Sequence, residues 1–206
     1  MSATRYLVVI GGGEHARVVI EAARSGGAFS VRGFVDPDPC VVTSERLEVP
    51  RLGDDTALAG LPTGTLCVLG LGTVGADRRR AVDRLSVLVK HWVAVVHARA
   101  WVSATALVEP GAVIMAGAMV NSGARIGAHA VINTGAIVEH DVVVGYGAQI
   151  APRAVLGGGA SVGDGAFVGL GACVRDHIRI GSDAFVGMGV VVTADVPDGV
   201  RQRPSL

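Results

Sequence analysis

The chain has 206 residues, enough for one large domain or two small ones, and its 18 basic residues balance its 18 acidic residues. No net field favours nucleic acid or an anionic membrane, and the basic run Arg78-Arg79-Arg80 is interpreted as a solvated helix face. No apolar run approaches the ~20 residues that a membrane helix needs. The three cysteines form no C-x-x-C pair, which predicts a reduced, cytoplasmic protein without structural disulfides.

Strands and helices are predicted to alternate over residues 1–95, where apolar runs are followed by glycines or turn residues. In chain order we expect a strand at 6–10, a helix at 14–24, a strand at 31–35, a strand at 65–69 and a helix at 78–88. This alternation indicates a small parallel α/β sheet of the Rossmann-like kind.

Three glycines, Gly11, Gly12 and Gly13, join the first strand to the first helix and, with Ala16, match the dinucleotide fingerprint. A glycine turn lets backbone N–H groups and the positive end of the helix face a diphosphate. Asp36 follows the second predicted strand, 20 residues beyond Ala16. Because only one mononucleotide-binding half fits here, we predict a nucleotide-sugar site. The alternative is that these glycines only turn the strand into the helix.

A strict repeat of six residues fills the second half of the chain. Residues 96–197 divide into 17 hexads without an insertion; each begins with Val, Ile or Leu, and 13 carry Ala in the fifth place. Three six-residue sides, each a short strand and a corner, can close a triangular coil, and coils stacked ~4.8 Å apart bury one continuous core. The pattern therefore predicts a parallel β-helix over 96–197, followed by a tail at 198–206. An antiparallel sandwich would show alternation and irregular turns instead.

The repeats contain four histidines: His97, His129, His140 and His177. Three are interpreted as ordinary surface residues, but His140 lies near a corner between Glu139 and Asp141. A carboxylate beside an imidazole fixes its tautomer and supports the imidazolium, as general-base catalysis requires. One coil of 18 residues further lies Gly158, whose N–H could stabilise charge on a thioester oxygen. The alternatives are a solvated corner pair and glycines that only relieve a tight corner.

Taken together, the two halves resemble the sialic-acid O-acetyltransferase-like family of bacterial sugar acyltransferases, within the hexapeptide-repeat superfamily of left-handed β-helix enzymes. Three segments carry the resemblance: 9–20 (VIGGGEHARVVI), 33–36 (GFVD) and 132–141 (INTGAIVEHD). The resemblance implies N-acetylation of a nucleotide-linked amino sugar, such as a 4-amino-4,6-dideoxy sugar, by acetyl-CoA without a metal cofactor. It also implies that His140 is the base and that Asp141 orients its ring.

The resemblance and the corner positions together define the expected site. The candidates are His140 and Asp141 for catalysis, Gly11, Gly12, Gly13, His15, Asp36 and Asn133 for the nucleotide sugar, and Gln149, Ala151, Gly158 and Gly169 for CoA. Gln149 stands where some family members carry a second histidine near the acyl group. A monomeric prism would expose extended apolar walls, so we also expect a homotrimer with sites at its subunit interfaces.

Other classes of function remain open at this point. A sugar O-acetyltransferase acting on a free or lipid-linked sugar is the nearest alternative, and a non-catalytic β-helix scaffold or nucleotide sensor is another. A γ-class carbonic anhydrase needs three histidines around zinc, usually including a close pair. No His-x4-His pair occurs among the repeats, so we expect no metal site.

Overall fold

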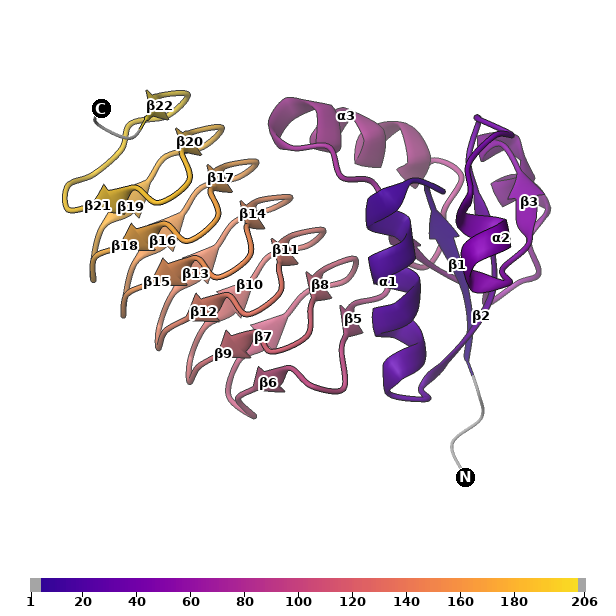
Figure 1. The fold of residues 1–206 in the computed structure, drawn as a ribbon, viewed down its shortest axis with the longest axis horizontal. Coiled ribbons are helices and arrows are strands. Elements are labelled where there is room, and N and C mark those ends of the chain that lie inside the picture. The colour runs from indigo at the N-terminus through magenta and orange to yellow at the C-terminus, as the bar shows by residue number, and fades with distance from the viewer. Residues whose placement is uncertain (1–4, 204–206) are drawn as a thin grey trace.

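The computed structural model describes residues 5–203; residues 1–4 and 204–206, the outermost parts of the predicted first domain and tail, lie outside the described residues. An α/β unit precedes a long prism of stacked coils (Figure 1). The elements of the α/β unit are β1 Arg5–Ile10, α1 Glu14–Ser25, β2 Phe29–Val35, α2 Thr43–Leu47, β3 Arg51–Gly53, the 3₁₀ helix η1 Asp55–Gly60, β4 Leu66–Leu69 and α3 Gly75–Ser86.

The α/β unit is built on a four-stranded parallel sheet in the order β3-β2-β1-β4. The chain runs outward from β1 to β3 and then returns to pair β4 with the other side of β1. The loops that follow β1 and β4 therefore meet at a topological switch point, where α/β sheets bind ligands. This confirms the predicted Rossmann-like unit. The short elements α2, β3 and η1 were not expected, because they are too brief to show periodicity.

Helix α1 packs between the sheet and the first coil of the prism, with its apolar face buried (Figure 1). Its Ala16 and Val19 pack in one apolar cluster with Leu7 of the sheet and with Val95 and Val113 of the prism. The two halves therefore share a continuous hydrophobic contact, which stabilises their joint through removal of apolar surface from water.

The prism consists of two-residue strands, and all but the last of them occupy the last place of one hexad and the first place of the next. These strands are β5 Val95–Val96, β6 Trp101–Val102, β7 Leu107–Val108, β8 Val113–Ile114, β9 Met119–Val120, β10 Arg125–Ile126, β11 Val131–Ile132, β12 Ile137–Val138, β13 Val143–Val144, β14 Gln149–Ile150, β15 Val155–Leu156, β16 Ser161–Val162, β17 Phe167–Val168, β18 Cys173–Val174, β19 Arg179–Ile180, β20 Phe185–Val186, β21 Val191–Val192 and β22 Arg201–Gln202.

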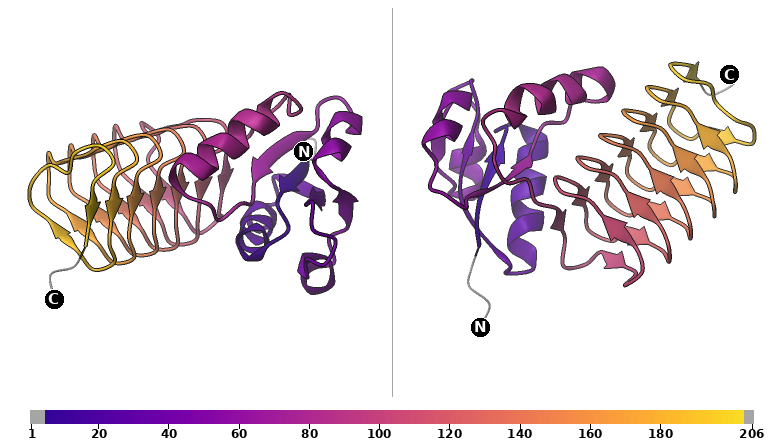
Figure 2. Two further views of the ribbon diagram at one scale, coloured as in Figure 1. Left: turned by 90° about the horizontal axis from the view of Figure 1, so that it is seen from above. Right: turned by 180° about the vertical axis from the view of Figure 1, so that it is seen from behind.

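Up to β21 every third strand joins the same sheet, and β22 joins beside β20, so the prism has a five-stranded, a seven-stranded and a six-stranded wall (Figure 2). The register advances by one coil, as in the pairing of Ile132 with Ile150. The first and fifth hexad places fill the core between the walls. The prediction of a left-handed parallel β-helix is confirmed. The solenoid extends beyond residue 197, because β22 pairs with β20 within the expected tail.

The fourth place of each hexad explains the abundance of glycine. From Gly111 to Gly189 this residue has φ between 55° and 78° at every corner, the left-handed region that costs other residues roughly 1–2 kcal/mol. Glycine fills most of these corners. The five that carry side chains are His129, Asp141, Arg153, His177 and Asp183. Because a side chain at positive φ is strained, these five residues are expected to have a role that compensates the strain.

Candidate active site

His140 and Asp141 form the turn between β12 and β13, on the edge where the six-stranded and five-stranded walls meet. The imidazole Nδ1 lies 3.0 Å from Oδ2 of Asp141, and both side chains are exposed. When Nδ1 donates to the carboxylate, Nε2 is left as the proton acceptor. The hydrogen bond to Asp141 raises the pKa of His140, and the charges of Asp141 and Glu139 add to this effect. The pair has the chemistry of a general base.

Gly158 lies directly beside this base, one coil further along the same edge. A Cβ at Gly158 would stand 2.5 Å from Nε2 of His140, so only glycine leaves room for the ring. Its neighbours are fixed by the coil: the N–H of Gly159 donates to the carbonyl of His140, and the carbonyl of Gly158 accepts from His177. Among residues 5–203 the amide of Gly158 itself has no backbone acceptor. The proton acceptor Nε2 of His140 and the free N–H donor of Gly158 are therefore neighbours at this corner.

The other expected CoA residues are placed differently. The amides of Ala151 and Gly169 donate to Val168 and Val186 at 2.8 Å and 2.9 Å, because the second hexad place still belongs to the β-ladder. Neither amide is free to donate to CoA, and contact through other atoms stays a prediction. The buried amide group of Gln149 donates from Nε2 to the carbonyl of Thr73 at 2.5 Å, which ties the prism to the α/β unit.

The glycine loop at the switch point divides into structural and open positions. Gly11 has φ +109°, and a Cβ at Gly12 would strike the ring of Phe34 at 2.5 Å, so both glycines are required by packing. A Cβ at Gly13 would have nothing within 4 Å, and this residue begins α1 without a side-chain cap. Oδ2 of Asp36 accepts the N–H of Gly12 at 2.6 Å, so this carboxylate shapes the loop itself. The uncapped amides after Gly13 remain a site for an anion.

His15 and Asn133 lie apart from the His140 corner. His15 faces the joint between the two halves, where burial, and secondly the charge of Arg78, lower its pKa to about 4. Asn133 follows β11 at the preceding edge of the prism, and its Oδ1 accepts the N–H of Thr134 at 2.8 Å. Within one chain, neither residue is brought together with His140 by any described hydrogen bond.

Two interpretations of charged and titratable residues were wrong. Arg78 is fully buried rather than solvated, and donates to the carbonyls of Leu71 and His129 at 2.7 Å and 3.0 Å. His129 is only 4% exposed, packs edge-on against Trp92, and has a pKa lowered to about 4 by burial first and the charge of Arg78 second. The spacing of Arg78 with Val82 and Leu85 is that of a buried helix face, and this signal could have identified it.

No helix within residues 5–203 has the length and apolar character to cross a membrane. In the same part of the chain, no group of three or more His, Cys, Asp or Glu side chains is arranged to hold a metal ion.

Comparisons with known proteins identify the class to which this β-helix with its leading α/β unit belongs. The PglD N-terminal domain family matches residues 6–85. PerB from Caulobacter crescentus, solved with CoA and GDP-perosamine, is 39% identical with a TM-score of 0.88, covering 97% of this chain and 94% of that chain. The acetyltransferase domain of PglB from Neisseria gonorrhoeae, solved with acetyl coenzyme A, is 30% identical with a TM-score of 0.89, covering 97% and 96%.

A third structure, GDP-perosamine N-acetyltransferase from Caulobacter crescentus with one histidine replaced by alanine, is 37% identical with a TM-score of 0.87, covering 97% of this chain and 93% of that chain. The comparison with curated proteins gives no significant match. The chain belongs to the bacterial sugar N-acetyltransferases of the hexapeptide-repeat superfamily. It is an acyltransferase, and the resemblance noted in the sequence is confirmed.

Proposed function

We propose that this enzyme transfers an acetyl group from acetyl-CoA to the amino group of a nucleotide-linked amino sugar, with His140 as general base. The observation that carries the proposal is the corner where Nε2 of His140, oriented by Asp141, adjoins the free N–H of Gly158. Solved relatives with CoA and GDP-perosamine support the substrate classes. Two structures of the Caulobacter enzyme carry a replaced histidine, which supports a functional histidine in the family.

The chemistry follows from this corner. The acceptor nitrogen attacks the thioester carbonyl carbon and releases a proton to Nε2 of His140, while the carbonyl electrons move onto oxygen beside the N–H of Gly158. The intermediate then collapses, the C–S bond breaks, and the leaving CoA thiolate takes the proton from the imidazolium. Direct transfer needs no acyl-enzyme. Cys173 belongs to the outward face of β18 on a wall, not to the corner turn that holds His140.

The acceptor would be held by the α/β unit. The first amides of α1 lack a side-chain cap, and the open space at Gly13 lets a diphosphate approach them. Glu14 does not oppose this, because its carboxylate is exposed and lies 3.8 Å from the guanidinium of Arg17.

We further propose a homotrimer in which each site is shared between two subunits. His140 lies on the edge between the six-stranded and five-stranded walls, whereas α3 contacts the edge between the five-stranded and seven-stranded walls. Helix α3 and the base of one chain thus lie at different edges of the prism. On the six-stranded wall, the outward residue of each two-residue strand is apolar or a thiol, which makes one continuous column: Trp101, Met119, Ile137, Val155, Cys173 and Val191. Such a column suits burial against a second copy.

The proposal is tested by measuring CoA release from acetyl-CoA with UDP-, dTDP- and GDP-linked 4-amino-4,6-dideoxy sugars, each beside the matching 4-hydroxy sugar. We expect release with at least one amino sugar, a product that is 42 Da heavier, and no reaction of its hydroxy counterpart. His140→Ala should lower kcat by ~10²–10⁴ with little change in either KM. Equal turnover of the hydroxy sugars would make the enzyme an O-acetyltransferase, and wild-type kcat in His140→Ala would remove the base assignment.

A further inference from the structure

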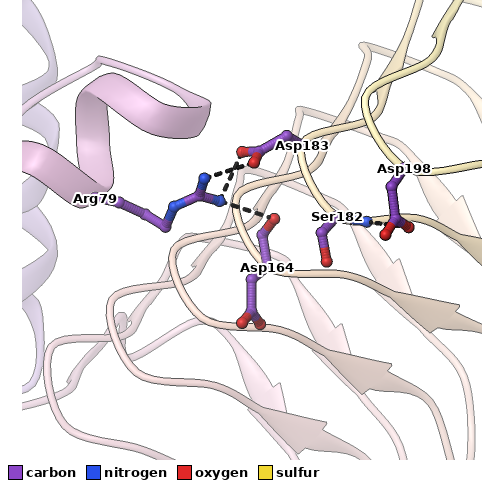
Figure 3. A network of polar contacts seen from close by, with 5 residues as sticks. All are labelled: Arg79, Asp164, Ser182, Asp183 and Asp198. Carbon is purple, nitrogen blue, oxygen red and sulfur yellow. Dashed lines mark hydrogen bonds and ion pairs between the residues drawn. The ribbon is translucent and has the colours of Figure 1, made fainter.

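A bidentate ion pair joins α3 to the far part of the prism. Nη1 and Nη2 of Arg79 lie 2.6 Å and 2.5 Å from Oδ1 and Oδ2 of Asp183, and Nη1 also donates to the carbonyl of Asp164 at 3.2 Å (Figure 3). Helix α3 belongs to the α/β unit, whereas Asp183 lies in the turn between β19 and β20, near the last coils. The ion pair therefore joins the α/β unit to a coil near the end of the prism that lies away from that unit (Figure 1).

The coil itself does not need an aspartate at this place. Asp183 occupies a fourth hexad place with φ 55°, where glycine is the residue that fits without strain. One coil earlier, a Cβ at Gly165 would stand 2.6 Å from Oδ1 of Asp183 and against the guanidinium of Arg79. Asp183 is kept at a strained position, and the absence of a side chain at Gly165 leaves room for the ion pair. The role of Asp183 therefore lies in its contact with α3 and not in the coil.

The ion pair fixes the helix that follows the β4 loop, residues 70–74. Two further contacts hold this loop on the prism: Arg78 donates to Leu71 and to His129, and Gln149 donates to Thr73. Across the switch point the same loop packs against the glycine loop, because a Cβ at Gly11 would lie 2.8 Å from the side chain of Leu71. The orientation of α3 on the prism is thus transmitted by direct contacts to the expected nucleotide loop.

We propose that Arg79 and Asp183 are positioning residues for acetyl transfer, which fix the α/β unit on the prism so that the amino group of the bound acceptor meets the His140 corner. This inference rests on the function proposed above. Neither residue lies at the base or at the glycine loop, so they act through α3. Exposed ion pairs contribute little to stability, but a bidentate arginine–carboxylate pair specifies orientation. A small misplacement of reacting groups is costly in rate.

The test compares Asp183→Gly with Arg153→Gly. Both replace a left-handed fourth-place residue by the glycine that the coil prefers, but Arg153 is exposed on another edge and has no side-chain hydrogen bond among the described residues. We expect Asp183→Gly to lower kcat/KM for the acceptor by about 10-fold to 100-fold, with the KM for acetyl-CoA unchanged and thermal stability undiminished. Arg153→Gly should retain wild-type kinetics.

Exchanging the charges of Arg79 and Asp183 tests whether acceptor turnover can be rescued. Arg153 shows that the fourth place accepts arginine, so Arg79→Asp combined with Asp183→Arg should recover acceptor turnover that either single change loses. Arg79→Lys should be intermediate, because lysine keeps the charge and loses the bidentate geometry. Unchanged acceptor kinetics in Asp183→Gly, or no recovery in the exchanged pair, would overturn the positioning role.

Hydrogen exchange separates this inference from the proposed function. Amides of α3 should exchange faster in Asp183→Gly than in wild type or Arg153→Gly, whatever the substrate proves to be. If the wild-type enzyme acetylates no nucleotide sugar but α3 is released, the proposed function fails and the fixing of α3 stands. If transfer occurs and α3 exchanges equally in all three proteins, the function stands and the positioning role fails.

Discussion

At the scale of single residues, His140 and Asp141 combine a conformational cost with a chemical purpose. Asp141 holds φ 61° at a corner that glycine usually fills, and its carboxylate accepts from Nδ1 of His140. Aspartate is among the few residues that tolerate this conformation. The strain is therefore explained by the orientation that Asp141 gives to the imidazole.

This pair predicts the pH dependence of the reaction. General-base catalysis needs the neutral imidazole, so kcat/KM should rise with pH along a limb set by the free-enzyme pKa of His140. Because the hydrogen bond to Asp141 raises that pKa, the limb should lie above the ordinary histidine value of 6.5. Asp141→Asn should move the limb to lower pH and cost less in kcat than His140→Ala, since it keeps the base.

The measurement is a kcat/KM profile for wild type, Asp141→Asn and His140→Ala with one acceptor. Titration of the acceptor amine contributes the same limb to every profile, so only differences between variants report on His140. Asparagine also tolerates positive φ, which keeps the corner intact in Asp141→Asn. An identical limb in all three proteins would show that His140 is not the titrating base.

At the scale of elements, the glycine loop and α1 predict a selective loss of acceptor binding. Gly13 has φ −78° and open space around it, so Gly13→Asp should fold normally. Its carboxylate would oppose a diphosphate at the amides that begin α1. We expect the KM for the nucleotide sugar to rise by at least 10-fold and the KM for acetyl-CoA to stay constant. Gly13→Ser, which adds a neutral side chain of similar reach, is the control, and equal effects on both substrates would contradict the role of the loop.

The joint between α3 and the prism predicts acid sensitivity. His15 and His129 have pKa values of about 4 in the folded protein, against 6.5 when unfolded. Between these values the unfolded chain binds protons that the folded chain does not, so stability falls as the pH drops from 6.5 to 4. The slope is up to about 1.4 kcal/mol per pH unit for each histidine.

Urea unfolding at several pH values between 7 and 4.5 measures this slope. His129→Asn should reduce it, because asparagine accepts the positive φ of this corner without titrating. A slope that is the same in wild type and His129→Asn would contradict the buried, neutral state of His129.

The elements also show what the sequence could and could not predict. The hexads predicted the prism because each place has one fixed environment: aliphatic residues inside and glycine at positive φ. The loop glycines could not be distinguished, because the roles of Gly11 and Gly12 depend on Leu71 and Phe34 from other elements. The burial of Arg78 could have been predicted from its spacing with Val82 and Leu85 on one face of α3. Its contact with the carbonyl of His129 could not, because that residue lies 51 positions away. The His140 corner needed no distant partner, because Asp141 is adjacent and Gly158 lies one repeat away.

At the scale of the whole molecule, the outward column of the six-stranded wall predicts assembly. Val155 lies at its centre, paired with Ile137 and Cys173 on either side. Val155→Glu would place a charge in the proposed interface, where burial without a partner is unfavourable. We expect wild type to sediment as a trimer and Val155→Glu as a folded, inactive monomer. Val87→Glu, at an 83% exposed position after α3, should remain trimeric and active. A monomeric wild type would remove the shared-site proposal.

The shared site makes a stronger prediction about mixed trimers. In the shared arrangement, each site combines the glycine loop of one subunit with His140 of its neighbour. A site is then active only when both its loop and its base are unmutated. Co-expressed Gly13→Asp and His140→Ala chains, each strongly impaired alone at an acceptor concentration well below the KM of Gly13→Asp, would then form sites in which an intact loop from the His140→Ala chain meets an intact base from the Gly13→Asp chain. Random assembly into a cyclic trimer gives about a quarter of wild-type activity. If loop and base of the same chain formed the site, every site would carry one mutation and the mixture would stay inactive, so activity of purified mixed trimers decides between the two arrangements.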